Sequence, residues 1–452
     1  MKETWRITSD GNIIRKKRIQ YPNGDVYDGD ILNGKWNGEG TFTSSSDRKY
    51  VGTFKDGYFH GHGIYEYSDG KGQCKYNGSF HYGKRCGLGI FLDSSGNEWN
   101  GTWVDDSFTG EGQVNMTNGD RLIGEFKNNK LECTSSIIEY HNGDRYEGPC
   151  HAGKMDGSVV GKYSFHGRSK AYYEGLFFRG LKHGKGTFCY EDGSIYKGDF
   201  YEDNITGYGI IEYAIFRSPL KSYRGYWENG HYQGDGELLY HDAVHVIRSY
   251  TGSFIRGNFD GFGKLLYRDG GFYEGDFQVG KRHGSHGTRL WSSGNTFVGS
   301  WSDDGMKNGM YTDPSKCSYY AGSFASGQKN GRGREIWNLT GKQKKSKDPL
   351  LAWLYKCDGL YLYEGEYRNG TFDGHGKLFA PCGRKYEGCW RMGRPSGFGQ
   401  AILLSKGERS LYRPYKYVGE WSEGKRHGQG MLFYHDGTKK SGLFVFGQLK
   451  LT

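Results

Sequence analysis

The sequence has little proline, few aliphatic residues and no long apolar run. Proline contributes only 8 of the 452 residues, which argues against a collagen-like chain. No stretch approaches the roughly 20 consecutive apolar residues of a membrane-spanning helix. The first 20 residues contain no apolar core, so they do not resemble a secretory signal peptide. We therefore expect a soluble, intracellular protein.

Cysteine is irregularly placed, and the common catalytic and metal-binding motifs are missing. The nine cysteines form no C-x-x-C pair, which favours free thiols in a reducing compartment. Cys382 and Cys389 have no matching Cys or His pair beside them, so zinc is not indicated. No G-x-x-x-x-G-K-[ST], H-E-x-x-H, EF-hand loop or G-x-S-x-G occurs. We expect no enzymatic activity, no cofactor and no metal.

Glycine and aromatic residues are abundant. The chain has 77 glycines, and 16% of its residues are Phe, Trp or Tyr. A disordered chain would lack the aromatics. This combination is typical of many short strands joined by tight turns, and it predicts a thin, extended β protein. The net charge of +10 comes from 61 basic and 51 acidic residues that are interleaved, so it is a weak indication of nucleic-acid or membrane binding.

One short pattern, aromatic-x-Gly-x-aromatic, recurs along the chain. Eight of the sixteen spacings between its starts are 23 residues, and most of the others are a few residues longer. The regular period identifies one repeat array. Clear copies start at Tyr50, Tyr76, Trp99, Tyr173, Tyr196, Tyr223, Tyr250, Tyr273, Phe297, Tyr320, Tyr363, Tyr386 and Tyr417, and weaker ones at Tyr27, Leu122, Tyr146 and Lys440.

Each repeat has the features of a β-hairpin. Aromatic residues and glycines alternate at period two in "YVGTF" (50–54) and in "GHGIYEY" (61–67), which predicts two strands. The "DG", "NG" and "EG" pairs between such segments favour hairpin turns. Glycine beside large rings lets an aromatic side chain lie over bare backbone. A single hairpin is marginal in water, so the repeats are expected to stack on one another.

The motif "KRHG" is interpreted as part of a turn. His60, His183, His283 and His427 each precede the first glycine of a G-x-G. Other repeats have Cys, Asp, Asn, Gln or Ser at this position. A position that accepts all of these within one molecule is a polar turn position, so we do not expect a catalytic histidine there.

The unit Y-x-G-x-[FW]-x-x-G-x-x-x-G-x-G resembles the MORN repeat (membrane occupation and recognition nexus), from residue 27 to about residue 447. The resemblance implies an all-β fold: an elongated, twisted, single-layer antiparallel sheet, or β-hairpin solenoid, of about 17 repeats. Proteins of this family include ciliary and cytoskeletal scaffolds. The expected organisation is a basic leader (1–20), about 13 repeats (21–340), a lysine-rich and apolar insertion (341–359), and about 4 repeats with a C-terminal cap (360–452).

Two repeats depart from the pattern. After "LIGEF" (122–126) the G-x-G is missing, and Cys150 replaces the second aromatic residue of the next repeat. Residues 122–160 are therefore either a bend or weak joint, or the result of sequence drift. The C-terminal "LFVFGQLKLT" (443–452) either caps the sheet edge or contacts a second copy of the chain.

The function expected from the sequence is a non-catalytic scaffold of a cytoskeletal or ciliary (axonemal, radial-spoke-like) assembly. It would bind a partner helix or peptide along an aromatic groove. The alternative is a membrane adaptor for anionic phospholipids or phosphoinositides, whose contacts would come from the insertion. The candidate anionic-surface contacts are Lys342, Lys344, Lys345 and Lys347. The candidate partner-binding residues are Tyr50, Phe54, Tyr76, Phe80, Trp99, Trp103, Tyr273, Phe277, Trp301, Leu351, Trp353, Leu354, Trp390 and Trp421.

Overall fold

A computed structural model describes residues 4–7, 13–168, 170–215, 218–242, 245–339, 357–404 and 407–450. It contains 38 strands, and the one helical element in these ranges is a single 3-10 turn, η1 (Pro314–Lys316). No helix in the described part of the chain is long and apolar enough to cross a membrane. The chain divides into two compact units, unit 1 (1–218 and 226–230) and unit 2 (219–225 and 231–452).

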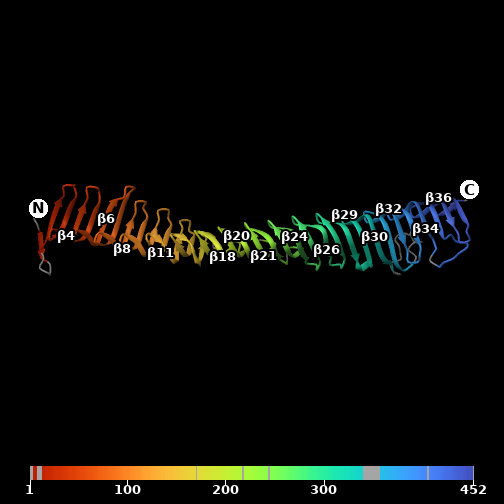
Figure 1. The fold of residues 1–452 in the computed structure, drawn as a ribbon, viewed down its shortest axis with the longest axis horizontal. Helices are drawn as coiled ribbons and strands as arrows, with labels where there is room; N and C mark the ends of the chain where they lie inside the picture. The colour runs from red at the N-terminus through yellow and green to blue at the C-terminus, as the bar shows by residue number, and fades with distance from the viewer. Residues whose placement is uncertain are drawn as a thin grey trace. The chain divides into compact units, whose positions relative to one another are not determined.

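Unit 1 is a single antiparallel layer in which each strand lies beside the next one in the sequence (Figure 1). At two places, β11 and β14, a strand pairs with two successive short strands instead of one. The strands are β1 (Thr4–Ile7), β2 (Ile13–Gln20), β3 (Val26–Leu32), β4 (Lys35–Thr43), β5 (Lys49–Lys55), β6 (Tyr58–Ser68), β7 (Gln73–His81), β8 (Lys84–Leu92), β9 (Glu98–Val104), β10 (Ser107–Asn115), β11 (Arg121–Lys127), β12 (Lys130–Leu131), β13 (Cys133–Glu139), β14 (Arg145–His151), β15 (Lys154–Met155), β16 (Gly157–Ser164), β17 (Tyr172–Phe178), β18 (Leu181–Cys189), β19 (Ile195–Tyr201) and β20 (Asn204–Glu212).

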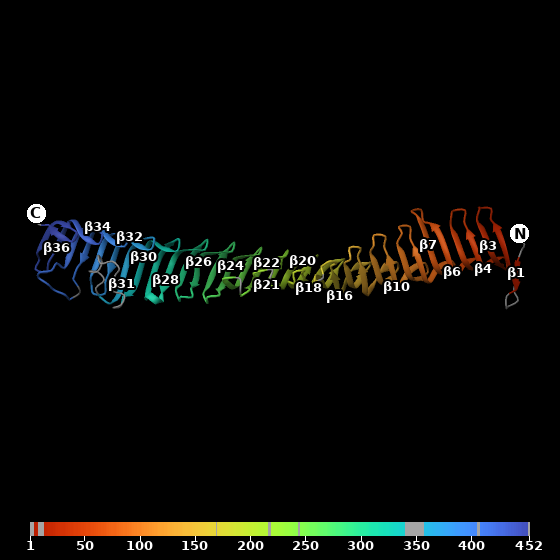
Figure 2. The same ribbon diagram turned by 180° about the vertical axis from the view of Figure 1, so that it is seen from behind.

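Unit 2 repeats the same arrangement, as Figure 2 shows from the opposite side. Residues of β21 (Leu220–Glu228) are divided between the two units. The strands of unit 2 are β22 (His231–Tyr240), β23 (Ile247–Ile255), β24 (Asn258–Tyr267), β25 (Phe272–Gln278), β26 (Lys281–Leu290), β27 (Thr296–Ser302), β28 (Gly305–Asp313), β29 (Ser318–Ala325), β30 (Gln328–Leu339), β31 (Gly359–Arg368), β32 (Thr371–Phe379), β33 (Lys385–Arg391), β34 (Arg394–Ile402), β35 (Lys416–Ser422), β36 (Lys425–Phe433), β37 (Lys439–Val445) and β38 (Gln448–Lys450).

The predicted hairpin array is confirmed. Every one of the seventeen repeat starts lies in the first strand of a hairpin, including the weak copies at Leu122 and Lys440. The N-terminal segment differs from a simple solvated leader, because β2 extends the sheet by pairing with β3. The side chains of "RKKR" (15–18) are nevertheless exposed, although β2 lies between β1 and β3 in the sheet.

A tyrosine placed over glycine is the repeated packing element. Within β7 and β8, Gly78 and Gly89 face each other, and the ring of Tyr76 lies over both of them. A Cβ atom on Gly78 would stand 2.5 Å from the Tyr76 hydroxyl oxygen, so only glycine fits. That hydroxyl donates a hydrogen bond to the carbonyl of Ser79 at 3.2 Å. The same bond to residue i+3 is made by Tyr27, Tyr50, Tyr146, Tyr173, Tyr196, Tyr250, Tyr273, Tyr320, Tyr363, Tyr386 and Tyr417.

Edge-to-face ring contacts join successive repeats. Tyr50 contacts Phe54 of its own repeat (centroids 4.9 Å apart, planes at 83°) and Phe80 of the next (5.2 Å, 88°). This geometry places the positive edge of one ring against the negative face of another, and each such pair is worth about 0.5–1.5 kcal/mol beyond burial. Because a sheet of one layer has no second layer to cover it, these side chains form the core.

Polar side chains link the turns of neighbouring hairpins. In unit 1 the amide of Arg85 donates to Asp106 Oδ1 at 3.0 Å, and the amide of Phe108 donates to Asn129 Oδ1 at 2.9 Å. In unit 2 the amide of Val279 donates to Asp260 Oδ2 at 3.1 Å. These bonds satisfy backbone donors that the strand ladder leaves unpaired at its edge.

The irregular repeats at 122–160 interrupt the strands. The second strand of each hairpin is split, giving β12 with β13 and β15 with β16, and the register shifts between Cys133 and Ser136. Cys133 and Cys150 face each other across β13 and β14. The division between the two units lies further along the chain, at residues 219–230, so it does not coincide with the predicted joint.

Candidate interaction surface

The tyrosine face, which we define as the face of each sheet that carries Tyr50 and its equivalents, is the candidate site. Each strand contributes one side chain to a row that runs across this face, perpendicular to the strands. In this row Tyr50 lies between Phe42 of the preceding strand and Tyr65 of the following strand. The first-strand tyrosines are fully buried, whereas several second-strand residues are half-buried and reach solvent. The half-buried members of the row are Phe42, Tyr65, Phe91, Trp99, Leu122, Tyr163, Phe188, Tyr311 and Glu335.

Most of the candidate partner-binding residues lie beneath this surface. Their exposure is 5% or less in the case of Tyr50, Phe54, Tyr76, Phe80, Trp103, Tyr273, Phe277, Trp301, Trp390 and Trp421. Burial raises the pKa of Tyr273 to about 12, as expected for a phenol removed from water. In the free chain these side chains therefore support the face from within, and a direct role in partner contact stays a prediction.

The remaining candidates divide into two groups. Trp99 is half-buried on the tyrosine face and contacts Phe108 edge-on at 5.5 Å. The candidates of the insertion, which are Lys342, Lys344, Lys345, Lys347, Leu351, Trp353 and Leu354, lie outside the described residues.

One continuous stretch of accessible rings lies across β13–β18 of unit 1. Tyr140 contacts Tyr163 at 5.7 Å, and Tyr163 contacts Phe165 at 5.0 Å. Phe165 then contacts Phe188 at 5.9 Å, and Phe188 contacts Tyr190 at 4.7 Å. All five rings are half-buried, and we call them the ring path. They offer ring area and three tyrosine hydroxyl groups to a partner, the combination that favours protein recognition.

A second position on this face, near the start of the second strand of each hairpin, holds a ring in some repeats and a cation in others. Its side chain lies against the buried aromatic residues of the repeat. In some repeats a ring stacks on the buried tyrosine, such as Phe59 on Tyr50, with centroids 3.9 Å apart and planes at 7°. In others an arginine takes that place. The guanidinium carbon of Arg85 lies 4.2 Å from the Trp103 ring, and that of Arg282 lies 4.6 Å from the Trp301 ring.

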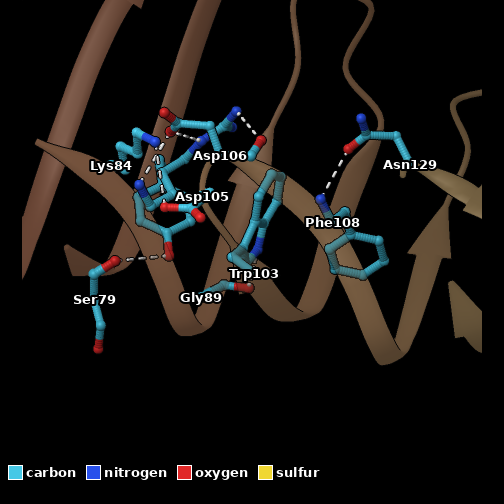
Figure 3. Close-up of polar contacts among 10 residues, drawn as sticks. Ser79, Lys84, Gly89, Trp103, Asp105, Asp106, Phe108 and Asn129 are labelled. Carbon is cyan, nitrogen blue, oxygen red and sulfur yellow. Dashed lines mark hydrogen bonds and ion pairs between the residues drawn. The ribbon is translucent and has the colours of Figure 1, made fainter. Parts of the chain in front are cut away.

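These two arginines are fixed by the next turn, and Figure 3 shows the surroundings of the first one. Arg85 Nε donates to Asp106 Oδ1 at 3.1 Å, while Lys84 pairs with Asp105 at 3.4 Å. Trp103 Nε1 donates to the Gly89 carbonyl at 3.2 Å. In unit 2, Arg282 Nε donates to Asp304 Oδ1 at 2.8 Å. We call this arrangement, an arginine held against a tryptophan ring by an aspartate of the next turn, the arginine clamp. The interpretation of "KRHG" as part of a turn did not include it, although a "DD" pair about 20 residues later in the sequence indicates the aspartate.

The repeat histidines occupy half-buried sites between rings. His60, His183 and His427 each have a buried Nδ1 without a hydrogen-bond partner. The ring of His183, for instance, lies 5.1 Å from that of Tyr201. Burial, and then Lys55, lower the pKa of His60. Within the described residues, no base or nucleophile is hydrogen-bonded to Nδ1 of these three histidines.

Unit 2 has two adjoining hollows on the tyrosine face. The first, of about 520 Å³, is lined by Trp291, Met306, Tyr311, Phe324 and Asn295 among others. The second, of about 490 Å³, is lined by Glu335, Trp337 and Phe372 among others. Among the described residues, no cluster of three or more His, Cys, Asp or Glu side chains could hold a metal ion.

The MORN repeat signature matches this sequence at residues 27–47, 50–72, 76–98, 173–195, 196–215, 250–272, 273–296, 320–338, 363–381, 386–401 and 417–439. The chain belongs to the MORN-repeat family. The copies that the signature does not match include those of the irregular region at 122–160.

Individual relatives are similar only over short segments. Alsin of Mus musculus is 37% identical over 82 residues, covering 18% of this chain and 5% of alsin. Human alsin is 35% identical over the same length, and the ALS2 C-terminal-like protein of Bos taurus is 31% identical over 109 residues, 11% of its length. This chain thus spans a small part of these relatives. A streptogramin B lyase structure overlaps at a TM-score of 0.10 and 10% identity over 86% of this chain and 94% of its own, too low to carry an argument.

Proposed function

We propose that this MORN-repeat protein is a non-catalytic scaffold of a cytoskeletal or ciliary assembly, and that it binds a helix or peptide of its partner along the tyrosine face. The ring path from Tyr140 to Tyr190 carries this proposal, since it is a connected set of accessible rings that no second layer covers within the described residues. Contiguous apolar surface of this kind marks an interaction site.

Binding of anionic membranes is the weaker alternative. The exposed "RKKR" of β2 supports it, because four basic side chains lie close together in one strand. Alternation along the strand directs Arg15 and Lys17 to one face and Lys16 and Arg18 to the other, which divides the cluster. Many other basic side chains pair with carboxylates, such as Lys75 with Glu66 at 2.9 Å. The positive charge is therefore dispersed rather than gathered into a stripe.

Site-specific photo-cross-linking in cells tests the scaffold proposal. A benzophenone amino acid replaces Phe188 on the ring path in one variant and Leu88 in the other. Leu88 is a matched control because it belongs to the same unit, is 74% exposed and points to the opposite face. We expect a discrete cross-linked protein from position 188 and none of that mass from position 88.

Fractionation of the same cells separates the two candidates. Retention of the chain in the pellet after detergent extraction and a salt wash supports the scaffold. Release by detergent, together with flotation of the purified chain on phosphatidylserine vesicles that salt abolishes, would instead support the membrane adaptor.

A further inference from the structure

One cation on the tyrosine face of unit 2 is buried without a carboxylate in direct contact with it. Arg289 of β26 is 7% exposed, and its Nη1 is buried with no hydrogen-bond partner. Within the described ranges no carboxylate forms an ion pair with it. Asp269 interacts with it only electrostatically, since Asp269 Oδ1 accepts from the Gly271 amide at 2.9 Å. A guanidinium stays protonated when buried, so a charge without a partner is costly here.

The position of Arg289 in the repeat makes it an exception. Among the second-strand members of the row, the charged residues are Arg289 and Glu335, and the others are apolar or tyrosine. Glu335 is satisfied, because it pairs with Lys329 and accepts from the Tyr367 hydroxyl at 3.0 Å. Arg289 has no equivalent arrangement. Its guanidinium carbon lies 3.8 Å from the centroid of the Tyr267 ring, which orients it but supplies no acceptor.

The surroundings of Arg289 indicate what a ligand would need. Trp291, whose ring centroid is 5.4 Å from the guanidinium carbon, lines the hollow of about 520 Å³ together with Met306 and Tyr311. Asn295 lines the same hollow, and its Oδ1 is buried without a partner while its Nδ2 donates to the Tyr311 hydroxyl at 2.7 Å. Trp291 is thus common to both features: its ring lies beside the cation that lacks an acceptor, and it lines the hollow that also holds an amide oxygen without a donor.

We propose that this part of the tyrosine face binds a peptide segment in which an acidic side chain lies beside an apolar one. The carboxylate pairs with Arg289, the apolar side chain enters the hollow beside Trp291, and a peptide N–H donates to Asn295 Oδ1. The proposal rests on the scaffold function and specifies the partner's chemistry. A membrane is the poorer occupant, because lipid headgroups present a broad surface, whereas Arg289 is a largely buried residue (7% exposed) that a narrow chain reaches more easily.

The test uses the full chain and a displayed library of random twelve-residue peptides. We expect peptides selected on the wild-type chain to share an Asp or Glu next to an aromatic or aliphatic residue. One such peptide and its Asp→Asn or Glu→Gln version are then titrated by fluorescence anisotropy. Neutralising the acid should weaken binding to the wild-type chain by about 30-fold or more, as for a largely desolvated charge pair. It should change binding to Arg289→Met by less than about 3-fold.

Two further variants keep the result interpretable. Arg282→Met is the matched control, since Arg282 lies on the same strand and face but is already paired with Asp304, so the acid preference should survive. Arg289→Lys should restore part of that preference. Arg289→Met should melt no lower than wild type, because it removes an unpaired buried charge.

Selected peptides without acidic enrichment, or an acid preference that survives in Arg289→Met, would overturn the inference and leave the scaffold proposal standing. An equal loss of the acid preference in Arg282→Met and Arg289→Met would also overturn it. The acidic peptide would then respond to the net charge of the chain rather than to Arg289. If no peptide is selected and position 188 gives no cross-link, the scaffold proposal fails as well.

Discussion

The ring of Tyr173 lies over Gly186, and a Cβ atom on that glycine would stand 2.5 Å from both Cε2 and the hydroxyl oxygen of the tyrosine. This relationship between β17 and β18 explains the strand glycines of the repeat, because the large rings need bare backbone on the opposite strand. Adding even one methyl group at these glycines should therefore lower the stability of the sheet.

Gly186→Ala should lower the free energy of unfolding of unit 1 by about 2–3 kcal/mol, the cost of forcing a methyl group into a packed site. Tyr173→Phe, which keeps the ring but removes the hydroxyl bond to the Leu176 carbonyl at 2.9 Å, should cost only about 1 kcal/mol. Urea denaturation followed by tryptophan fluorescence measures both. Equal effects would show that the hydroxyl, rather than the steric fit, dominates.

The fold should weaken steeply in alkali. Burial raises the pKa of Tyr273, Tyr320 and Tyr417 to about 12 each, whereas a tyrosine in the unfolded chain titrates near 10. A raised pKa means that the folded state holds its proton longer, so the stabilisation is complete below about pH 10 and is lost as the pH rises from 10 towards 12. Melting temperatures between pH 8 and 11.5 should stay level and then fall. A flat profile throughout would contradict the burial of these phenols.

The arginine clamp should show coupling between its two partners. A double-mutant cycle with Arg282→Met and Asp304→Asn should give an interaction free energy of about 1 kcal/mol, a modest value because Asp304 is about half exposed and water screens it. The Arg85–Asp106 pair of unit 1 is an internal replicate and should give a similar value. An interaction free energy near zero in both pairs would show that these Arg–Asp contacts do not stabilise the fold.

The turn-to-turn bonds should protect individual amides. Asn129→Gly removes the acceptor of the Phe108 amide without straining the left-handed backbone there (φ 66°), and we expect faster hydrogen exchange at Phe108 and a loss of about 1 kcal/mol. Asn100→Ala, at an exposed position of the neighbouring β9, should leave the exchange of Phe108 unchanged. Exchange measured by NMR or by mass spectrometry of overlapping peptides distinguishes the two variants.

The cysteines should react with iodoacetamide in the order of their exposure. Cys317 and Cys389 are exposed and should be alkylated first. Cys150 should be among the slowest, because burial raises its pKa to about 11 and leaves little thiolate at neutral pH. Timed labelling and peptide mass spectrometry test this. Early labelling of Cys150 would indicate that the split strands around β15 open readily.

The repeat architecture could be predicted from the sequence because its determinants are local. The 23-residue period, the turn dipeptides and the alternation of rings with glycine each act within one hairpin, so Tyr50 and Gly52 already indicate their strand. Which of these rings reach solvent could not be predicted from such local patterns. Whether Tyr65 reaches solvent while Tyr50 does not depends on the strands that lie on either side.

The candidate site was harder to predict for the same reason. The sequence pattern selected Tyr50, Phe54 and Trp301 as partner contacts. The structure buries their side chains, and partner contact through them stays a prediction. Arg289 was missed because it lies outside the motif. An alignment of the repeats against one another would have revealed it, since "GTRLW" (287–291) puts a cation where "GTFCY" (186–190) has a ring.

Each strand is hydrogen-bonded only to the strands beside it, and this gives either unit a distinctive response to mechanical load. Tension applied across the strands would act along the line of the hydrogen bonds and open them a few at a time. A unit held at its two edge strands would therefore unfold one hairpin at a time and refold when the tension falls. Its extension would increase in steps of one repeat.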